Sequence, residues 1–160
     1  MKRIIVSMLV AVVLITAVGC GKKTDSNNEA ADIVLDDSTL GNKLAGMFLT
    51  DISEGDVQAL AEKIASATEL DCVVIEANEG YLNGFSEEIT GFTSGVQISP
   101  MIGSIPFVAY ILKTDDAEGL KSTLEKAADP RWNICTEAAE TVCVTSGEYV
   151  FFTMCPGEDE

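Results

Sequence analysis

The sequence predicts an α+β domain, built from a single, mostly antiparallel sheet of four or five strands with two or three helices packed on one face. Three observations lead to this prediction. Two helical patterns come before any strand, short runs rich in β-branched residues occupy the middle of the chain, and a third helical pattern leads into a C-terminal hairpin. The predicted domain spans residues 39–156, which is long enough to bury its own core.

The first two predicted helices follow one another. Apolar residues between positions 40 and 48 recur at helical spacing, and Ser38 or Thr39 can cap the start of that helix. A second apolar face spans positions 57–65, with charged residues on the opposite side. Both helices are predicted to pack against the sheet and to carry no site.

Two strands are predicted from continuous apolar runs. Residues 70–77 (LDCVVIEA) are long enough for one buried strand, and residues 107–113 (FVAYILK) have the apolar character of a central strand. Residues 96–98 predict a short, loosely paired strand between them. A helix is then predicted over residues 117–128, which Pro130 ends.

The C-terminal hairpin is predicted from residues 141–145 and 149–154, which flank a glycine-containing turn. With Ser146-Gly147 as a two-residue loop, Cys143 faces Val150 and Cys155 faces Ala138. Residues 157–160 (GEDE) form an acidic tail.

Net charge and the absence of histidine restrict the function. The 160 residues carry 10 basic and 26 acidic side chains, so neither nucleic acid nor an anionic surface is an expected partner of the folded part. Histidine is absent, which excludes Ser-His-Asp and Cys-His catalysis and histidine zinc sites. We expect no metal, no cofactor and no catalytic residue, although Glu87-Glu88 and Asp115-Asp116 leave a carboxylate hydrolase as a third hypothesis.

Four cysteines of the predicted domain are candidates for disulfides. No pair has the C-x-x-C spacing of a redox or zinc motif, and an even number in an exported domain permits two bridges. The hairpin register favours a Cys135–Cys155 bridge and leaves Cys72 and Cys143 as a second pair on neighbouring strands. The alternative is that some of them are buried free thiols.

A glycine-rich connection between the two predicted strands is the candidate binding loop. Aromatic residues are interleaved with its glycines, and an apolar turn bracketed by Pro100 and Pro106 follows. The loop either contacts a ligand or is pinned to the core by its aromatic rings. The candidate contact residues are Tyr81, Phe85, Phe92, Met101 and Ile102.

The first twenty residues have the layout of a secretory signal. Lys2 and Arg3 precede an apolar run of about fifteen residues, which is short for a bilayer span, and small residues lead into Cys20. The stretch ending in Val18-Gly19-Cys20 resembles the lipobox of bacterial prolipoproteins, although Ala17 stands where leucine is usual. The resemblance implies a signal peptide over residues 1–19 that is removed, and lipid carried by Cys20.

Residues 20–38 then form a flexible polar tether, and the mature chain keeps eight basic against 26 acidic side chains, a net charge of −18. The mature domain is similar to small uncharacterised lipoproteins of Gram-positive anaerobes in the stretches GFSEEITGF, SPMIGSIPFVAYI, DPRWNICTEA and VFFTMCP. That resemblance implies a location and a fold type, and no activity.

The expected function is therefore that of a lipoprotein held on the extracytoplasmic face of the cell membrane through lipid on Cys20. It acts as a non-enzymatic binding or interaction module for an unknown protein, peptide or small-molecule ligand. The alternative is a thiol redox or metal-handling lipoprotein that uses Cys135, Cys143 and Cys155, which requires these thiols to be adjacent and at least one to be exposed.

Overall fold

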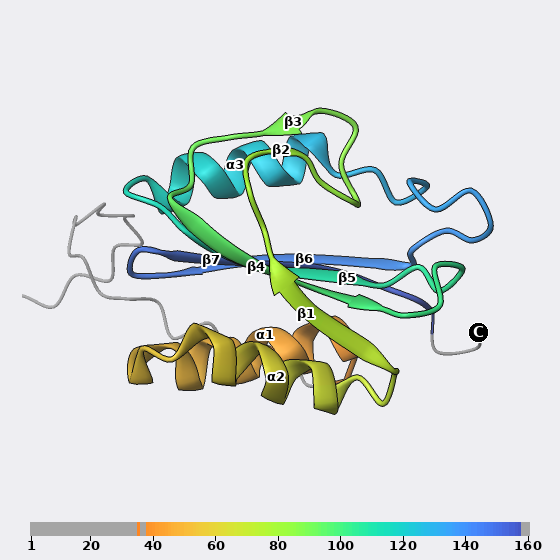
Figure 1. The fold of residues 1–160 in the computed structure, drawn as a ribbon, viewed down its shortest axis with the longest axis horizontal. Helices are drawn as coiled ribbons and strands as arrows, with labels where there is room; N and C mark the ends of the chain where they lie inside the picture. Colours follow the sequence, from red (N-terminus) through yellow and green to blue (C-terminus); the bar gives the residue numbers. More distant parts are fainter. Residues whose placement is uncertain (1–34, 36–37, 158–160) are drawn as a thin grey trace, which may run out of the picture. The chain divides into compact units, whose positions relative to one another are not determined.

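The computed structural model describes residue 35 and residues 38–157 (Figure 1). The predicted signal peptide, the lipidated Cys20, most of the predicted tether and most of the acidic tail lie outside the described residues. Leu35, which the tether prediction includes, is half-buried and packs against the core of the domain. The account that follows concerns residues 38–157.

A five-stranded antiparallel sheet forms the centre of the fold. Its strands are β1 (Cys72–Glu76), β4 (Ser94–Pro100), β5 (Val108–Lys113), β6 (Glu140–Ser146) and β7 (Tyr149–Cys155), in the order β1-β4-β5-β7-β6. The order confirms the α+β class, and it confirms that residues 107–113 form the central strand. The two edges of the sheet are β1 and β6, the positions where one side of a strand has no partner.

Helices α1 (Leu40–Asp51) and α2 (Val57–Ala67) cover one face of this sheet, as predicted, with a 3-10 turn at Ile52–Glu54 between them (Figure 1). Thr39 caps α1, because its side chain accepts a hydrogen bond from the Asn42 amide at 3.3 Å. Their apolar faces enclose one cluster of buried residues that includes Phe48, Ile98 and Phe151.

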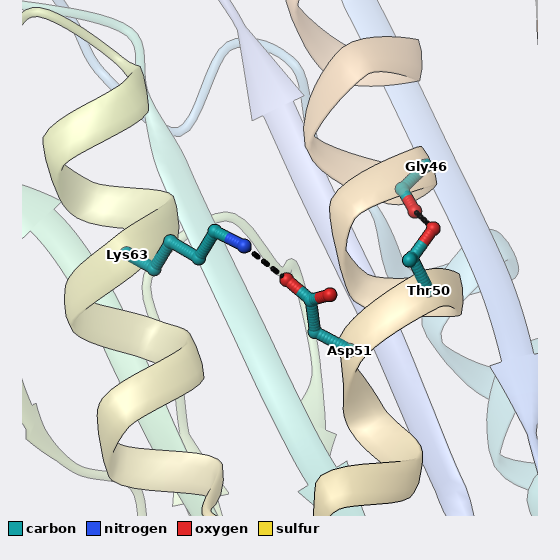
Figure 2. Close-up of polar contacts among 4 residues, drawn as sticks. All are labelled: Gly46, Thr50, Asp51 and Lys63. Atoms are coloured by element: carbon teal, nitrogen blue, oxygen red, sulfur yellow. Dashed lines mark hydrogen bonds and ion pairs between the residues drawn. The ribbon is translucent and has the colours of Figure 1, made fainter.

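An ion pair joins the two helices on their solvent side. The Lys63 ammonium of α2 lies 2.5 Å from Asp51 Oδ2 at the end of α1 (Figure 2). The preceding residue, Thr50, donates its hydroxyl to the carbonyl of Gly46, one turn earlier along α1, at 2.9 Å. The hydrogen bond to Asp51 raises the pKa of Lys63. Both charged groups keep contact with water, so the pair contributes little to stability.

Helix α3 (Ala117–Ala127) lies on the opposite face, which differs from the simplest prediction of a one-sided helical layer (Figure 1). The reason is the path of the chain: α3 connects β5 to β6, two parallel strands separated by β7. A short two-stranded ribbon, β2 (Gly80–Tyr81) with β3 (Glu88–Ile89), shares this face. A second buried cluster, containing Tyr110, Leu124 and Phe152, fills the space beneath them.

The first residue of β6 anchors the start of α1. The Glu140 carboxylate accepts hydrogen bonds from the Thr39 hydroxyl and, at 2.8 Å, from the Gly41 amide. A Cβ atom at Gly41 would lie 2.7 Å from that carboxylate, so a larger residue would displace the Glu140 side chain from this contact. The contact also places a negative charge at the positive end of the helix dipole.

The hairpin register corrects one prediction. The two-residue loop is Gly147-Glu148, with Gly147 at φ +58°, the positive φ that a type II′ turn requires at its first central position. Cys143 therefore faces Phe152, and Cys155 faces Glu140. The register moves by two residues relative to the prediction, so every side chain stays on its expected face.

Candidate binding site

The Pro100–Pro106 turn and the loop between α3 and β6 border an open hollow of about 430 Å³. We call it the loop hollow. Its lining also includes Asn83 after β2, Ser99 of β4, and Phe107 and Val108 where β5 begins, and the loop after α3 contributes Trp132 and Ile134. The volume lies in the range of small-molecule sites, which is about 300–1,000 Å³.

Hydrogen bonds join the two loops into one unit. The Asn133 amide nitrogen donates to the Gly103 carbonyl at 2.7 Å, and the Thr136 hydroxyl donates to the Ser104 carbonyl at 2.8 Å. The loop after α3 is further closed by an ion pair, in which Arg131 Nε lies 2.8 Å from Glu137 Oε2. The rim of the hollow is therefore cross-linked, although neither loop belongs to the sheet.

Exposed apolar side chains gather on these two loops. Met101 is 73% exposed, Ile102 is 59% exposed and Ile134 is 99% exposed. Single exposed apolar residues are common on protein surfaces, but three on two joined loops beside a hollow are typical of a contact surface. The sequence singled out Met101 and Ile102 and missed Ile134, for which the only signal was an apolar residue in an otherwise polar segment.

The structure divides the five predicted contact residues into two groups. Tyr81, Met101 and Ile102 are exposed, whereas Phe85 and Phe92 are buried. The two phenylalanine rings pack under α3 and the β2–β3 ribbon, in the same cluster as Tyr110. The aromatic residues of the glycine-rich connection thus serve mainly to pin it to the core, and the exposed positions belong chiefly to the Pro100–Pro106 turn.

One polar network links the sheet to the wall of the loop hollow. The buried Tyr110 hydroxyl donates to the Asn83 carbonyl at 2.9 Å and lies 3.1 Å from Gln97 Oε1. Desolvation raises the pKa of Tyr110, so the hydroxyl remains protonated. The position of Asn83 on the hollow is therefore fixed from within the core.

All four described cysteines are free thiols in the structure. Cys72 lies on β1 and Cys143 on β6, at opposite edges of the sheet, so they are not on neighbouring strands as predicted. Four strand spacings separate them by about 19 Å, whereas a disulfide needs Cα atoms within about 7 Å. Cys135 is exposed on the loop after α3 and Cys155 is buried. Their pairing stays a prediction.

The positions of Cys143 and Cys155 also bear on the alternative function in thiol redox chemistry or metal handling. Cys143 packs against the cluster under α3, whereas Cys155 belongs to the cluster under α1 and α2, on the other face of the sheet. Burial raises the pKa of each to about 12, which keeps both thiols protonated and unreactive at neutral pH. Within residues 38–157, no three Cys, Asp or Glu side chains are grouped so that they can hold a metal ion.

Two of the four candidate carboxylates belong to different elements. Asp116 caps α3, accepting a hydrogen bond from the Gly119 amide at 3.0 Å, and Glu88 belongs to β3.

Within the part of the chain that the structure describes, no helix is both long enough and apolar enough to cross a bilayer. No protein-family model, no curated protein and no solved structure matches this chain.

Proposed function

We propose that this protein is an extracytoplasmic lipoprotein, anchored in the cell membrane through lipid on Cys20, and that it binds a ligand without catalysis at the loop hollow. The observation that carries the proposal is a hollow with a cross-linked rim that is lined by the exposed Ile134, on loops that also carry the exposed Met101 and Ile102. The lipobox-like sequence supports the anchor, and the absence of histidine from the chain supports a role in binding.

The hollow combines apolar contact area with a few fixed polar groups. Asn83 and Ser99 supply hydrogen-bonding groups, and Trp132 with Ile134 supplies apolar surface, whereas Phe107 is only 2% exposed. This composition is typical of sites that recognise a ligand by shape and a small number of polar contacts. We therefore expect the ligand to enter with an apolar group, such as an aliphatic or aromatic side chain of a peptide.

Site-specific photocrosslinking in intact cells tests the binding role. A photoreactive amino acid replaces Ile134 at the rim of the hollow or, as a matched control, Thr123, which is exposed on α3 away from it. We expect a defined adduct from position 134 that disappears with Met101→Asp, and none from position 123. Equal adducts from both positions, or none from either, would refute the binding role of the hollow.

Replacing the predicted lipid carrier tests the anchor separately. The Cys20→Ala chain should lose the processed, membrane-bound form while its folded domain stays intact. The anchor proposal fails if the variant is processed and fractionates with membranes as the native chain does.

A further inference from the structure

We infer that the free edge of β1, with the groove between β1 and α2, binds an extended basic segment of another protein by strand addition. This surface is separate from the loop hollow, and the inference does not depend on the proposed function. It rests on three features: unpaired backbone groups, a groove beside them, and charge of one sign.

The first feature is the orientation of the β1 backbone. The Ala77 amide donates to the Gly95 carbonyl, and the Met101 amide donates to the Asp71 carbonyl. The odd-numbered residues of β1 therefore direct their amides toward β4, and the even-numbered residues direct theirs away from it. Val74 and Glu76 thus present N–H and C=O groups at the open edge of the sheet.

The second feature is a groove of about 380 Å³ along that edge. One wall is a stripe of α2 with four-residue spacing, Gln58, Glu62 and Ser66, and the other includes Cys72 and Val74 of β1. Side chains of an added strand alternate between the two faces of the sheet, so every second one would enter this groove.

On the other face of β1, the apolar side chains of Val73 and Ile75 are 38% and 49% exposed. Among the described residues, no helix covers them, because α3 lies over β6 and β7 at the far side of the sheet. The second edge strand, β6, differs from β1 in this respect, since α1 packs on one of its faces and α3 on the other. The β1 edge therefore offers apolar contacts to the alternate side chains of an added strand.

The third feature identifies the partner. The residues that line the groove and those of β1 include no lysine or arginine. Two acidic residues, Asp71 and Glu76, lie at the ends of β1, and Glu62 lies in the groove. A second copy of this chain is a poor occupant, because an antiparallel β1–β1 pair centred on Val74 brings Asp71 close to Glu76 of the other copy. A strand with lysine or arginine alternating with β-branched residues complements both the charge and the apolar side chains.

Peptide binding to the full-length chain in non-ionic detergent tests the inference. The probe is a fluorescent, capped nine-residue peptide of alternating lysine and valine, and anisotropy reports its Kd. We expect binding that weakens with salt, no binding of the glutamate–valine peptide, and at least about tenfold weaker binding when alternate peptide amides are N-methylated. Equal binding of the N-methylated peptide would reduce the interaction to charge alone and overturn strand addition.

Variants locate the site. Val74→Pro removes an outward N–H, a change that an edge strand tolerates, and it should weaken binding about tenfold, whereas Thr141→Pro on the exposed part of β6 should not. Glu62→Gln and Asp71→Asn should each weaken binding about two- to fivefold, and the matched Glu87→Gln and Asp115→Asn should leave Kd unchanged. The assignment would be overturned if the site variants and the control variants changed Kd equally. It would also be overturned if the chain dimerised without peptide and Val74→Pro abolished that dimerisation.

Discussion

Removal of the Tyr110 hydroxyl tests whether the core fixes the wall of the loop hollow. Tyr110 is fully buried, and Gln97, its side-chain partner, is only 7% exposed. In Tyr110→Phe, the Gln97 amide oxygen loses this partner within the core, whereas the Asn83 carbonyl belongs to a residue that water reaches. A hydrogen bond contributes about 1 kcal/mol net, and an unsatisfied buried acceptor costs about 1–3 kcal/mol. We expect the free energy of unfolding to fall by about 1.5–3 kcal/mol.

Urea unfolding, followed by Trp132 fluorescence and by circular dichroism, measures the loss. The double variant Tyr110→Phe with Gln97→Leu removes both polar partners, so it should lose at least about 1 kcal/mol less than the sum of the single variants. Tyr149→Phe is the matched control. That ring lies 5.7 Å from the Lys113 ammonium, and its hydroxyl has no hydrogen bond to a described residue. The reasoning is refuted if Tyr110→Phe costs no more than this control.

Four further predictions concern stability and thiol chemistry. Glu140→Gln should lower the free energy of unfolding by about 1–2 kcal/mol in urea, because the charge-assisted bonds to α1 weaken; an unchanged midpoint contradicts this. Lys63→Met should change the free energy of unfolding by less than about 1 kcal/mol, since the ion pair of Lys63 with Asp51 is exposed. Burial raises the pKa of Cys155 to about 12 from 9.0, so the unfolded chain loses this proton first. Between pH 8 and 10, deprotonation of Cys155 in the unfolded chain should lower the free energy of unfolding by about 1.4 kcal/mol. The free energy of unfolding of Cys155→Ala should therefore fall less steeply over this range. A thiol reagent should modify Cys135 before Cys155, and simultaneous modification counts against the observed burial.

The strongest periodic signals predicted the fold well. The helix beginning at Leu40 and the strand ending at Lys113 were predictable because their side chains alternate between core and solvent, or avoid solvent altogether, over one uninterrupted element. Strand β4 was predicted only over residues 96–98, although it spans Ser94–Pro100. Its polar Gln97 and Ser99 mask the pattern, and pairing with β1 and β5 on both sides compensates for their low strand propensity.

The candidate site was predictable only in part. The two prolines around Met101 and Ile102 marked an apolar turn, and the structure places both side chains in solvent. Nothing in the sequence indicated that the turn meets the loop after α3, because that contact depends on hydrogen bonds from Asn133 and Thr136 to backbone carbonyls about thirty residues away. Long-range contacts to backbone groups leave no periodic signal in the sequence.

One topological fact explains why the exposed apolar residues gather at a single corner of the sheet. Two helices cover one face across its width (Figure 1). On the other face, the described residues place α3 over β6 and β7, and the buried Phe85 ring of the glycine-rich connection packs on Tyr110 of β5. On this second face, no helix or strand of the described residues covers β1 and the Pro100 end of β4. Val73, Ile75, Met101 and Ile102 are exposed there, on a segment whose only charges are acidic. A chain that needed stability alone would bury these side chains, each fully buried one contributing about 1.5–3 kcal/mol. Their exposure therefore favours a binding role for this corner.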